Sequence, residues 1–357
     1  MFIQGVGSAT PAHRYTQQDC WAAAKRSARI AQLSGRSQAI IRKVLTGDNG
    51  IEARHFAMPD LEEVFSIDPN TLHRRFAENA PVIGEAAARK AVRHSGATLD
   101  DIDALVVGTC TGYLCPGLTS YISERLGLRP NIFLADLVGH GCGAALPNLA
   151  FANALLKAGQ ATRVLCICVE ICSAAFYLDN DPGVLISACI FGDGAGAVLV
   201  GKEPGANPPV MEWVDFETVL NPHDRELLRF EARDGMLRNV LDKSVPVLVV
   251  DHVSEVLNGV LKRNGLRQEE IAEWIVHSGG RDVLVALESA LHLAPGALRW
   301  SEGVLRDFGN VSSPSVIFAL ERALAGGAGM GTWFMSAFGA GISCHGALLN
   351  VRTPETP

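Results

Sequence analysis

Short apolar runs alternate along the chain with longer segments in which apolar residues recur every three or four positions. The runs at 104–107, 163–169 and 274–277 have the length and β-branched content of strands, and helical periodicity extends over 77–95 and 146–158. Alternating strands and amphipathic helices are typical of layered α/β folds, because each element buries one face against its neighbours. The pattern therefore predicts an α/β protein.

A stretch of turn-forming residues at 201–209 interrupts this alternation somewhat past the midpoint. The chain before it closes with a glycine turn and an apolar strand at 191–200, and the end of the chain repeats that device at 338–350. A chain of 357 residues is also too long for one small core. We therefore expect two related α/β halves, residues 1–205 and 206–357.

Composition narrows the class of protein. Hydrophobic residues make up 48% of the chain and charged residues 19%, which is typical of a compact globular protein. The net charge of −7, with no run of Lys or Arg, argues against a nucleic-acid partner. No apolar stretch reaches the ~18 residues of a membrane span. Nine scattered cysteines and an N-terminus unlike a signal peptide lead us to expect a cytoplasmic protein.

Cys142 is the strongest candidate for chemistry. It follows an apolar run, lies among Gly139, Gly141 and Gly143, and precedes a helical pattern. Small neighbours leave room for a large substrate, and the positive end of a helix dipole favours the thiolate form of a cysteine. His140 raises a metal alternative, but two ligands without a second Cys/His pair do not predict zinc. We interpret Cys142 as a nucleophile.

Two further residues lie at the ends of apolar runs and have complementary chemistry. His277 precedes Ser278-Gly279-Gly280, a position that directs a side chain into the cleft of an α/β fold. Asn310 lies in a Gly-Asn turn, and its amide gains interest beside a histidine because donors can polarise a thioester carbonyl. Together with Cys142 they could supply a nucleophile, a base and an amide donor.

Three glycine-rich segments, 139–143, 192–196 and 326–331, invite a nucleotide-binding interpretation. The first two lack the Gly-x-Gly-x-x-Gly spacing with an acidic residue about 20 positions on, and the third lacks the P-loop lysine. We interpret the second and third as tight turns between packed layers.

In order and separation, these motifs resemble the type III polyketide synthases, the chalcone synthase family. The resemblance runs from about Gly5 to about Asn350. It rests on Gly141-Cys142-Gly143, His277-Ser-Gly-Gly280, Gly309-Asn310-Val-Ser-Ser313, Cys110-Thr-Gly-Tyr-Leu-Cys-Pro-Gly117, Phe191-Gly-Asp-Gly194 and Phe338-Gly-Ala-Gly341. The implied fold is the duplicated αβαβα arrangement of the thiolases.

The resemblance implies an acyltransferase reaction and a homodimer. His277 and the helix start would hold Cys142 as a thiolate that accepts an acyl starter from coenzyme A (CoA). His277 and Asn310 would then bind the malonyl-CoA carbonyl while decarboxylation produces an enolate that lengthens the chain. The substrates would be CoA thioesters, with no metal and no further cofactor. Arg42, Lys43 and Arg54 lie where the family places residues that bind the CoA phosphates.

Departures from the plant enzymes bear on the product. Phe191 matches the gatekeeping aromatic of the family, whereas the second gatekeeper region reads Leu237-Arg-Asn-Val240 without an aromatic. The remaining positions implied for the pocket, the dimer contact and the late glycine loop are Cys172, Ala175, Cys115, Gly339 and Gly341. Because these positions carry less bulky side chains, the chain resembles the microbial members of the family that convert fatty acyl starters into alkylpyrones or alkylresorcinols.

There are four alternatives to this activity. An aromatic-starter chalcone or stilbene-type synthase would share the same three residues. An initiating β-ketoacyl carrier-protein synthase typically has Gln-Ala-Asn after its histidine, whereas Ser278-Gly-Gly follows His277. A hydroxymethylglutaryl-type synthase would need an acidic residue near the cysteine. An inactive partner subunit should have lost the nucleophile, which is present here.

Overall fold

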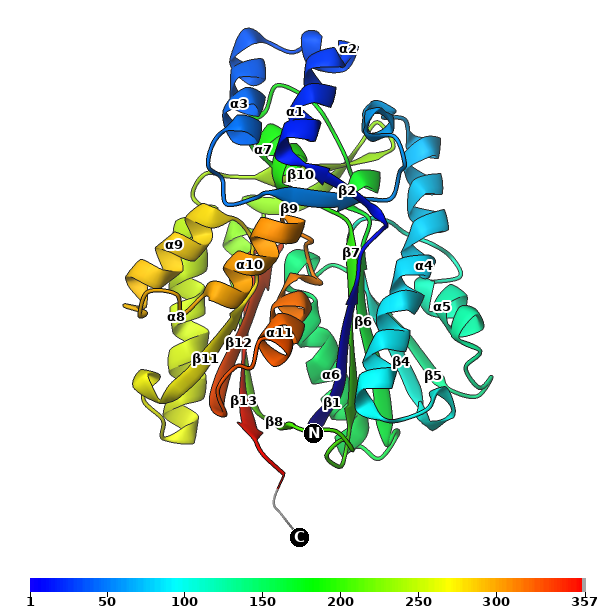
Figure 1. Cartoon of the computed structure of the whole chain (residues 1–357), viewed down its shortest axis with the longest axis vertical. Coiled ribbons are helices and arrows are strands. Elements are labelled where there is room, and N and C mark those ends of the chain that lie inside the picture. The colour runs from blue at the N-terminus through cyan, green and yellow to red at the C-terminus, as the bar shows by residue number, and fades with distance from the viewer. Residues whose placement is uncertain (355–357) are drawn as a thin grey trace.

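The computed structural model describes residues 1–354, and nine strands of that range form one mixed sheet (Figure 1). The order across the sheet is β11-β12-β13-β8-β1-β7-β6-β4-β5. Strands β1, β4, β5, β6 and β7 span Phe2–Ala9, Ala104–Gly108, Phe133–Leu137, Arg163–Glu170 and Gly194–Gly201. Strands β8, β11, β12 and β13 span Val210–Leu220, Ile271–Val276, Gly331–Gly339 and Ser343–Arg352. The sheet thus divides at the β1–β8 contact into two groups, one from each half of the chain.

Both groups of strands repeat one pattern of directions. β1 is antiparallel to β7, β7 is antiparallel to β6, and β6 is parallel to β4. β8, β13, β12 and β11 follow the same order of two antiparallel pairs and one parallel pair. The glycine-turn segments at 191–200 and 338–350 lead into the equivalent strands β7 and β13, so the echo in the sequence reflects a structural duplication. The boundary expected near residue 205 falls in the loop between β7 and β8.

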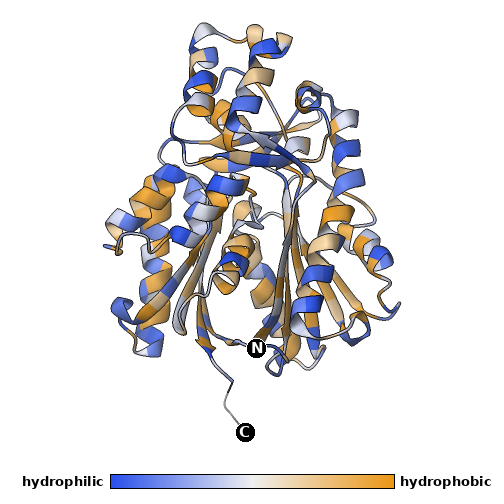
Figure 2. Ribbon diagram, viewed as in Figure 1, coloured by the Kyte–Doolittle hydropathy of each residue, from blue (hydrophilic) through white to orange (hydrophobic). Residues whose placement is uncertain are grey.

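Helices complete five layers. α4 (Pro69–Ser95) covers the outer face of the first strand group, and α8 (Val245–Asn264) covers the outer face of the second. α6 (Ala145–Lys157) and α11 (Ser315–Ala325) lie between the two groups (Figure 1). Apolar side chains concentrate where these layers meet (Figure 2). The predicted thiolase-like αβαβα fold is confirmed. Among residues 1–354, no helix combines the length and apolar composition that crossing a membrane requires.

One predicted helix is longer than expected. Periodicity indicated a helix from residue 77, whereas α4 begins at Pro69. The Asp68 side chain accepts a hydrogen bond from the Thr71 backbone N–H at 3.0 Å, and a proline at the first helical position has a backbone angle already suited to a helix. Capping therefore starts the helix two turns before the apolar periodicity becomes clear.

A smaller assembly of helices and ribbons lies across one end of the layers, at the top of Figure 1. It comprises helices α1 (Gln17–Arg26), α2 (Ala28–Ala31), α3 (Gly35–Thr46) and α7 (Pro182–Ile190) with the ribbons β2–β3 (His13–Thr16, Ala53–Phe56) and β9–β10 (Leu228–Arg233, Met236–Leu241). The remaining helices are α5 (Leu118–Leu126), α9 (Arg281–Ala290) and α10 (Arg299–Phe308). A separate apolar core joins α1, α3 and α7 through residues such as Ala24, Ile41 and Leu185. This cap covers the carboxyl ends of strands β4, β6 and β11, where ligands bind in α/β folds.

Candidate active site

Cys142 lies in a single helical turn, Gly141–Gly143, between β5 and the start of α6. Gly141 has φ of 54°, a conformation that L side chains rarely adopt. Gly339 packs against the back of this turn, because a Cβ at that position would lie 2.4 Å from both the Gly143 nitrogen and the His140 oxygen. The glycines thus allow the β12 end of the second half to support the nucleophile of the first half.

His277 directly follows β11, and its side chain is nearly inaccessible, with 1% relative exposure. The imidazole packs edge-on against Phe338, with ring centroids 4.8 Å apart, and its Nδ1 atom has no hydrogen-bond partner. Because Phe338 precedes Gly339, one strand end contacts both the histidine and the Cys142 turn. The structure therefore brings the predicted histidine to the predicted nucleophile.

Asn310 connects the histidine loop to the cysteine through Ser312. Its Nδ2 donates to the Gly279 carbonyl at 3.0 Å, and its Oδ1 accepts from the Ser312 backbone N–H at 2.8 Å. The Ser312 hydroxyl then lies 3.2 Å from the Cys142 sulfur. A chain of contacts thus runs from Cys142 through Ser312 and Asn310 to the loop that follows His277. The catalytic roles of these residues stay predictions. Ser312 was not among the site residues predicted from the sequence.

The electrostatics of the site differ from the sequence prediction. Burial raises the pKa of the Cys142 thiol to about 12, although the hydrogen bond from Ser312 opposes this shift. Burial also lowers the pKa of the His277 imidazole to about 3. Both groups are therefore neutral near pH 7 in the substrate-free site. Burial therefore opposes the thiolate that the helix start was predicted to favour, and the thiolate stays a prediction.

A buried carboxyl group supports the site and was missed by the sequence analysis. Glu170, at the end of β6, is fully buried and accepts hydrogen bonds from the Cys110 N–H at 3.0 Å, the Thr111 hydroxyl at 2.8 Å and the Ser313 hydroxyl at 2.6 Å. Burial raises the pKa of Glu170. A glutamate at the end of an otherwise apolar run was the only signal in the sequence. The carboxyl group holds the Cys110 loop against the Ser312 loop.

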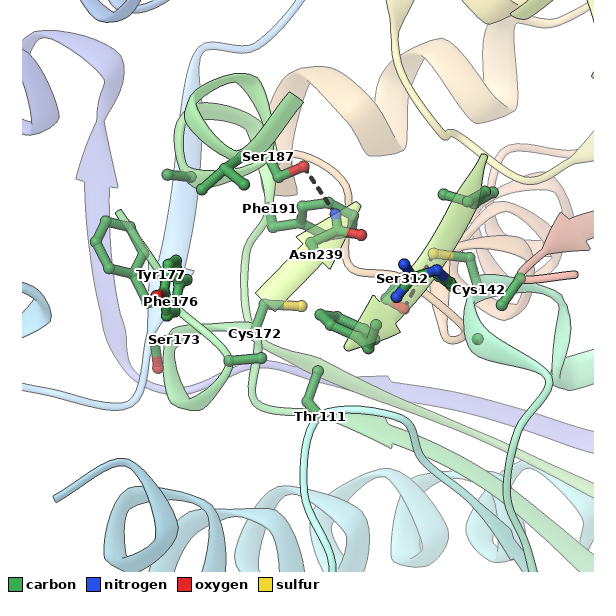
Figure 3. A pocket seen from close by; sticks show the side chains of 18 of the residues that line it. Thr111, Cys142, Cys172, Ser173, Phe176, Tyr177, Ser187, Phe191, Asn239 and Ser312 are labelled. Carbon is green, nitrogen blue, oxygen red and sulfur yellow. Dashed lines mark hydrogen bonds between the residues drawn. The ribbon is translucent and has the colours of Figure 1, made fainter. Parts of the chain in front are cut away.

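Cys142 opens into a cavity of about 740 Å³, including its open mouth (Figure 3). Three predicted pocket residues, Phe191, Cys172 and Ala175, line it. The rest of its wall is mainly apolar and includes Phe56, Phe176, Val184, Ala188, Leu228 and Phe230. The cavity therefore offers the nucleophile a largely apolar space.

Four other predicted positions do not line this cavity. Leu237 lies next to the Asp234–Gly235 turn of the β9–β10 ribbon, and Asn239, one step further along the same face, lines the wall instead. Gly339 and Gly341 flank the lining residue Ala340. Cys115 is exposed in the loop before α5. The position of Leu237 near the ribbon turn keeps it out of the lining of this cavity, and its role in the substrate pocket stays a prediction.

The three cations predicted to bind CoA differ in their surroundings. Arg42 and Lys43 are exposed on α3. Arg54 is only 3% exposed, and its guanidinium donates to the Gln17 side chain at 3.1 Å and to the Ala188 and Phe191 carbonyls at 2.9 Å each. The charge of Arg54 is used inside the cap, where it holds the end of α7 in place, so these surroundings do not favour the predicted contact with CoA phosphates.

A cysteine and a histidine at the junction of two repeated α/β halves suit acyl transfer to sulfur, because an imidazole can take the thiol proton; this is the chemistry of thiolase-fold condensing enzymes. Family comparison is more specific. Residues 5–204 match the family model described as chalcone and stilbene synthases, N-terminal domain, and residues 218–352 match the corresponding C-terminal domain. The chain belongs to the chalcone and stilbene synthase family. It is thus a type III polyketide synthase, of the acyltransferase class.

Individual relatives agree with this assignment. The chain is 31% identical over 334 residues to a 3,5-dihydroxyphenylacetyl-CoA synthase of Streptomyces toyocaensis, covering 91% of this chain and 83% of that one. It is 30% identical to a 1,3,6,8-tetrahydroxynaphthalene synthase of Streptomyces peucetius subsp. caesius, covering 97% and 92%. The crystal structure of PKS-I from the brown alga Ectocarpus siliculosus matches with a TM-score of 0.88 at 26% identity, covering 98% and 97%.

Proposed function

We propose that this enzyme loads an acyl group from an acyl-CoA onto Cys142 and extends it by repeated decarboxylative condensation with malonyl-CoA. The observation that carries the proposal is the contact chain from Cys142 through Ser312 to Asn310, which opens into a largely apolar cavity. The family assignment disfavours an initiating β-ketoacyl carrier-protein synthase, because both family models describe chalcone and stilbene synthases.

In the loading step, the Cys142 sulfur attacks the thioester carbonyl carbon and expels CoA. Because both Cys142 and His277 are neutral at rest, the thiol proton moves to His277 as the carbon–sulfur bond forms. The CoA thiolate leaves and receives that proton, which restores the neutral imidazole. Ser312 can donate to the developing sulfur charge from 3.2 Å.

In the extension step, His277 and Asn310 bind the thioester carbonyl of malonyl-CoA. One Asn310 amide N–H is occupied by the Gly279 carbonyl, which leaves the second available as a donor. Cleavage of the carboxyl carbon bond releases CO₂ and places the electron pair on an enolate oxygen, which these donors stabilise. The enolate carbon attacks the acyl group on Cys142, so the chain grows by two carbons and the sulfur is freed.

The starter that we propose is a fatty acyl group, with an alkylpyrone or alkylresorcinol as product. The cavity wall is mostly apolar, and a second apolar cavity lies beside it under α1, α3 and α7. Phe56, Phe176 and Ala188 line both cavities. Burial of an alkyl chain in such surroundings is favourable by about 0.8 kcal/mol for each methylene group.

A second candidate follows from the relatives. Two proteins at 30–31% identity are named as synthases of 3,5-dihydroxyphenylacetyl-CoA and 1,3,6,8-tetrahydroxynaphthalene, which are hydroxylated aromatic compounds without an alkyl tail. A product of this kind would leave the apolar side cavity unused. The two candidates share the same catalytic residues and differ in the starter.

We also infer a homodimer formed through the free edge of β5. This strand ends the sheet, and Phe133, Leu134 and Val138 are 46%, 41% and 63% exposed there. Tyr113, on the same loop as Cys115, is 73% exposed. An unpaired strand edge with exposed apolar side chains is well suited to pairing with a second copy.

Product analysis by mass spectrometry tests the proposal. The purified enzyme would receive malonyl-CoA alone or with acetyl-, benzoyl-, coumaroyl-, hexanoyl- or decanoyl-CoA, and Cys142→Ala would serve as control. Alkylpyrones or alkylresorcinols from the fatty starters, absent with Cys142→Ala, would support the fatty acyl candidate. Aromatic products from malonyl-CoA alone would favour the second candidate, and a single β-ketoacyl product would contradict iterative extension.

A further inference from the structure

Asn239 places an amide group in the wall of the mainly apolar cavity. It lies on β10, is 9% exposed, and shares the lining with Phe191, Leu228 and Phe230 (Figure 3). A polar side chain in an apolar wall lowers stability unless it is hydrogen-bonded or serves a ligand.

The orientation of this amide is fixed by Ser187 on α7. The Ser187 hydroxyl donates to the Gly183 carbonyl at 2.8 Å, so only its oxygen lone pairs face Asn239. Asn239 Nδ2 therefore donates to Ser187 Oγ, at 2.7 Å. Its carbonyl oxygen points away from Ser187, as Figure 3 shows. Within residues 1–354, neither the second N–H nor the Oδ1 atom of Asn239 has a hydrogen-bond partner.

The backbone beneath Asn239 is held by ion pairs on the opposite face of β10. The Arg238 guanidinium lies 2.7 Å from Asp179, 3.2 Å from Asp181 and 3.2 Å from Glu231. Its side chain is only 10% exposed, so these pairs are poorly screened by solvent. These ion pairs join β10 to the loop that leads into α7, next to Asn239. The amide is thus held in position before a ligand binds.

We propose that Asn239 binds one 1,3-dicarbonyl unit of the growing polyketide and thereby sets the number of extensions. The enol form of a 1,3-diketone carries one hydroxyl donor and one carbonyl acceptor close together. The free N–H of Asn239 donates to the carbonyl, and its Oδ1 accepts from the enol hydroxyl. Ser187 is a positioning residue that fixes the orientation of the amide. The inference rests on the proposed iterative extension.

This interaction begins only after two condensations, because the first condensation gives a β-keto thioester and a 1,3-diketone first appears in the triketide. Loss of Asn239 should therefore affect late extensions more than loading of Cys142. Without the amide, the chain leaves the wall and cyclises earlier, which gives shorter products. If Asn239 had only a structural role, its loss would lower the rates of loading and of every extension together.

The experiment compares Asn239→Leu, Asn239→Asp and Ser187→Ala with the wild type, using hexanoyl-CoA and malonyl-CoA. Mass spectrometry gives the triketide-to-tetraketide ratio, and the mass of the intact protein gives the rate of hexanoyl loading. Loss of one buried hydrogen bond predicts a ratio raised about fivefold in Asn239→Leu, and a smaller rise in Ser187→Ala. Asn239→Asp, which keeps the side-chain shape, should also raise the ratio because it cannot donate to a carbonyl.

The exposed Asn70 on α4 provides a matched control, since Asn70→Leu makes the same chemical change away from the cavity. If the wild type is active and both Asn239 variants leave the triketide-to-tetraketide ratio unchanged, the inference about Asn239 is overturned. The proposed function is not affected by that result. Equal losses of loading and extension would also overturn the inference, because they indicate a structural role. A wild type that makes no polyketide would overturn the proposed function as well.

Discussion

The hydroxyl oxygen of Ser312 lies 3.2 Å from the sulfur of Cys142, although the two residues are 170 positions apart in the chain. The same hydroxyl lies 3.6 Å from the Cys110 sulfur. Ser312 has φ of 58°, which is uncommon for a residue with a side chain, and its N–H is bound by Asn310. Asn310 therefore does more than offer an amide to substrate, because it also holds the residue that contacts the nucleophile.

Ser312→Ala should make Cys142 less reactive. The hydrogen bond from Ser312 lowers the pKa of a thiol that burial raises, so its removal raises that pKa further. We expect alkylation of Cys142 by iodoacetamide at pH 8.5 to slow about fivefold, the effect of one lost hydrogen bond. Peptide mass spectrometry measures the rate at Cys142 itself. An unchanged rate would show that Ser312 has no influence on the sulfur.

The pH dependence of Cys142 alkylation should lack a plateau near neutral pH. With the thiol pKa at about 12 and the His277 pKa at about 3, the thiolate fraction rises about tenfold per pH unit across the neutral range. Rates measured from pH 6 to about pH 10 on the substrate-free enzyme should therefore increase continuously. A plateau beginning below pH 8 would instead indicate a resting thiolate–imidazolium pair.

Gly339→Ala should disrupt the nucleophile turn. A methyl group at this position would lie 2.4 Å from two backbone atoms of the 140–143 segment, which must then move. Displacement of a nucleophile by about 1 Å can lower kcat about 100-fold. Gly35→Ala is the matched control, since within residues 1–354 no atom beyond its chain neighbours and the backbone of its own helix lies within 4 Å of the added carbon. Equal kcat values in the two variants would contradict the proposed support of Cys142 by β12.

Arg54 and the pair Arg42 and Lys43 should respond differently to substitution by alanine. Arg54→Ala removes the donor from three acceptors, one buried and two partly buried, so the free energy of unfolding should fall by about 3 kcal/mol. If Arg42 and Lys43 bind phosphate, their double substitution should raise KM for malonyl-CoA about fivefold with little change in stability. Thermal unfolding and steady-state kinetics measure both effects. A raised KM with unchanged stability in Arg54→Ala would reverse the assignment.

Some features of the fold and of the candidate site could be predicted closely from the sequence, and others could not. Strands β4 and β6 and helix α6 were predicted closely because apolar periodicity is a local property of the chain. Cys142, His277 and Asn310 each lay in a distinctive motif at the end of an apolar run. The sequence did not predict that Leu237 lies outside the cavity lining or that Arg54 is buried in the cap, because the position along a ribbon and the direction of a guanidinium depend on contacts with distant segments.

The sequence by itself determined the layered fold and the internal repeat, and it predicted three catalytic side chains, since each is expressed in local spacing and residue type. Only the tertiary structure revealed that Ser312 contacts Cys142, that Glu170 joins two loops, and that Asn239 lies in the cavity wall. It also revealed the burial that raises the pKa of the Cys142 thiol. A pKa depends on how completely other segments exclude water from the sulfur, and no local pattern records that burial.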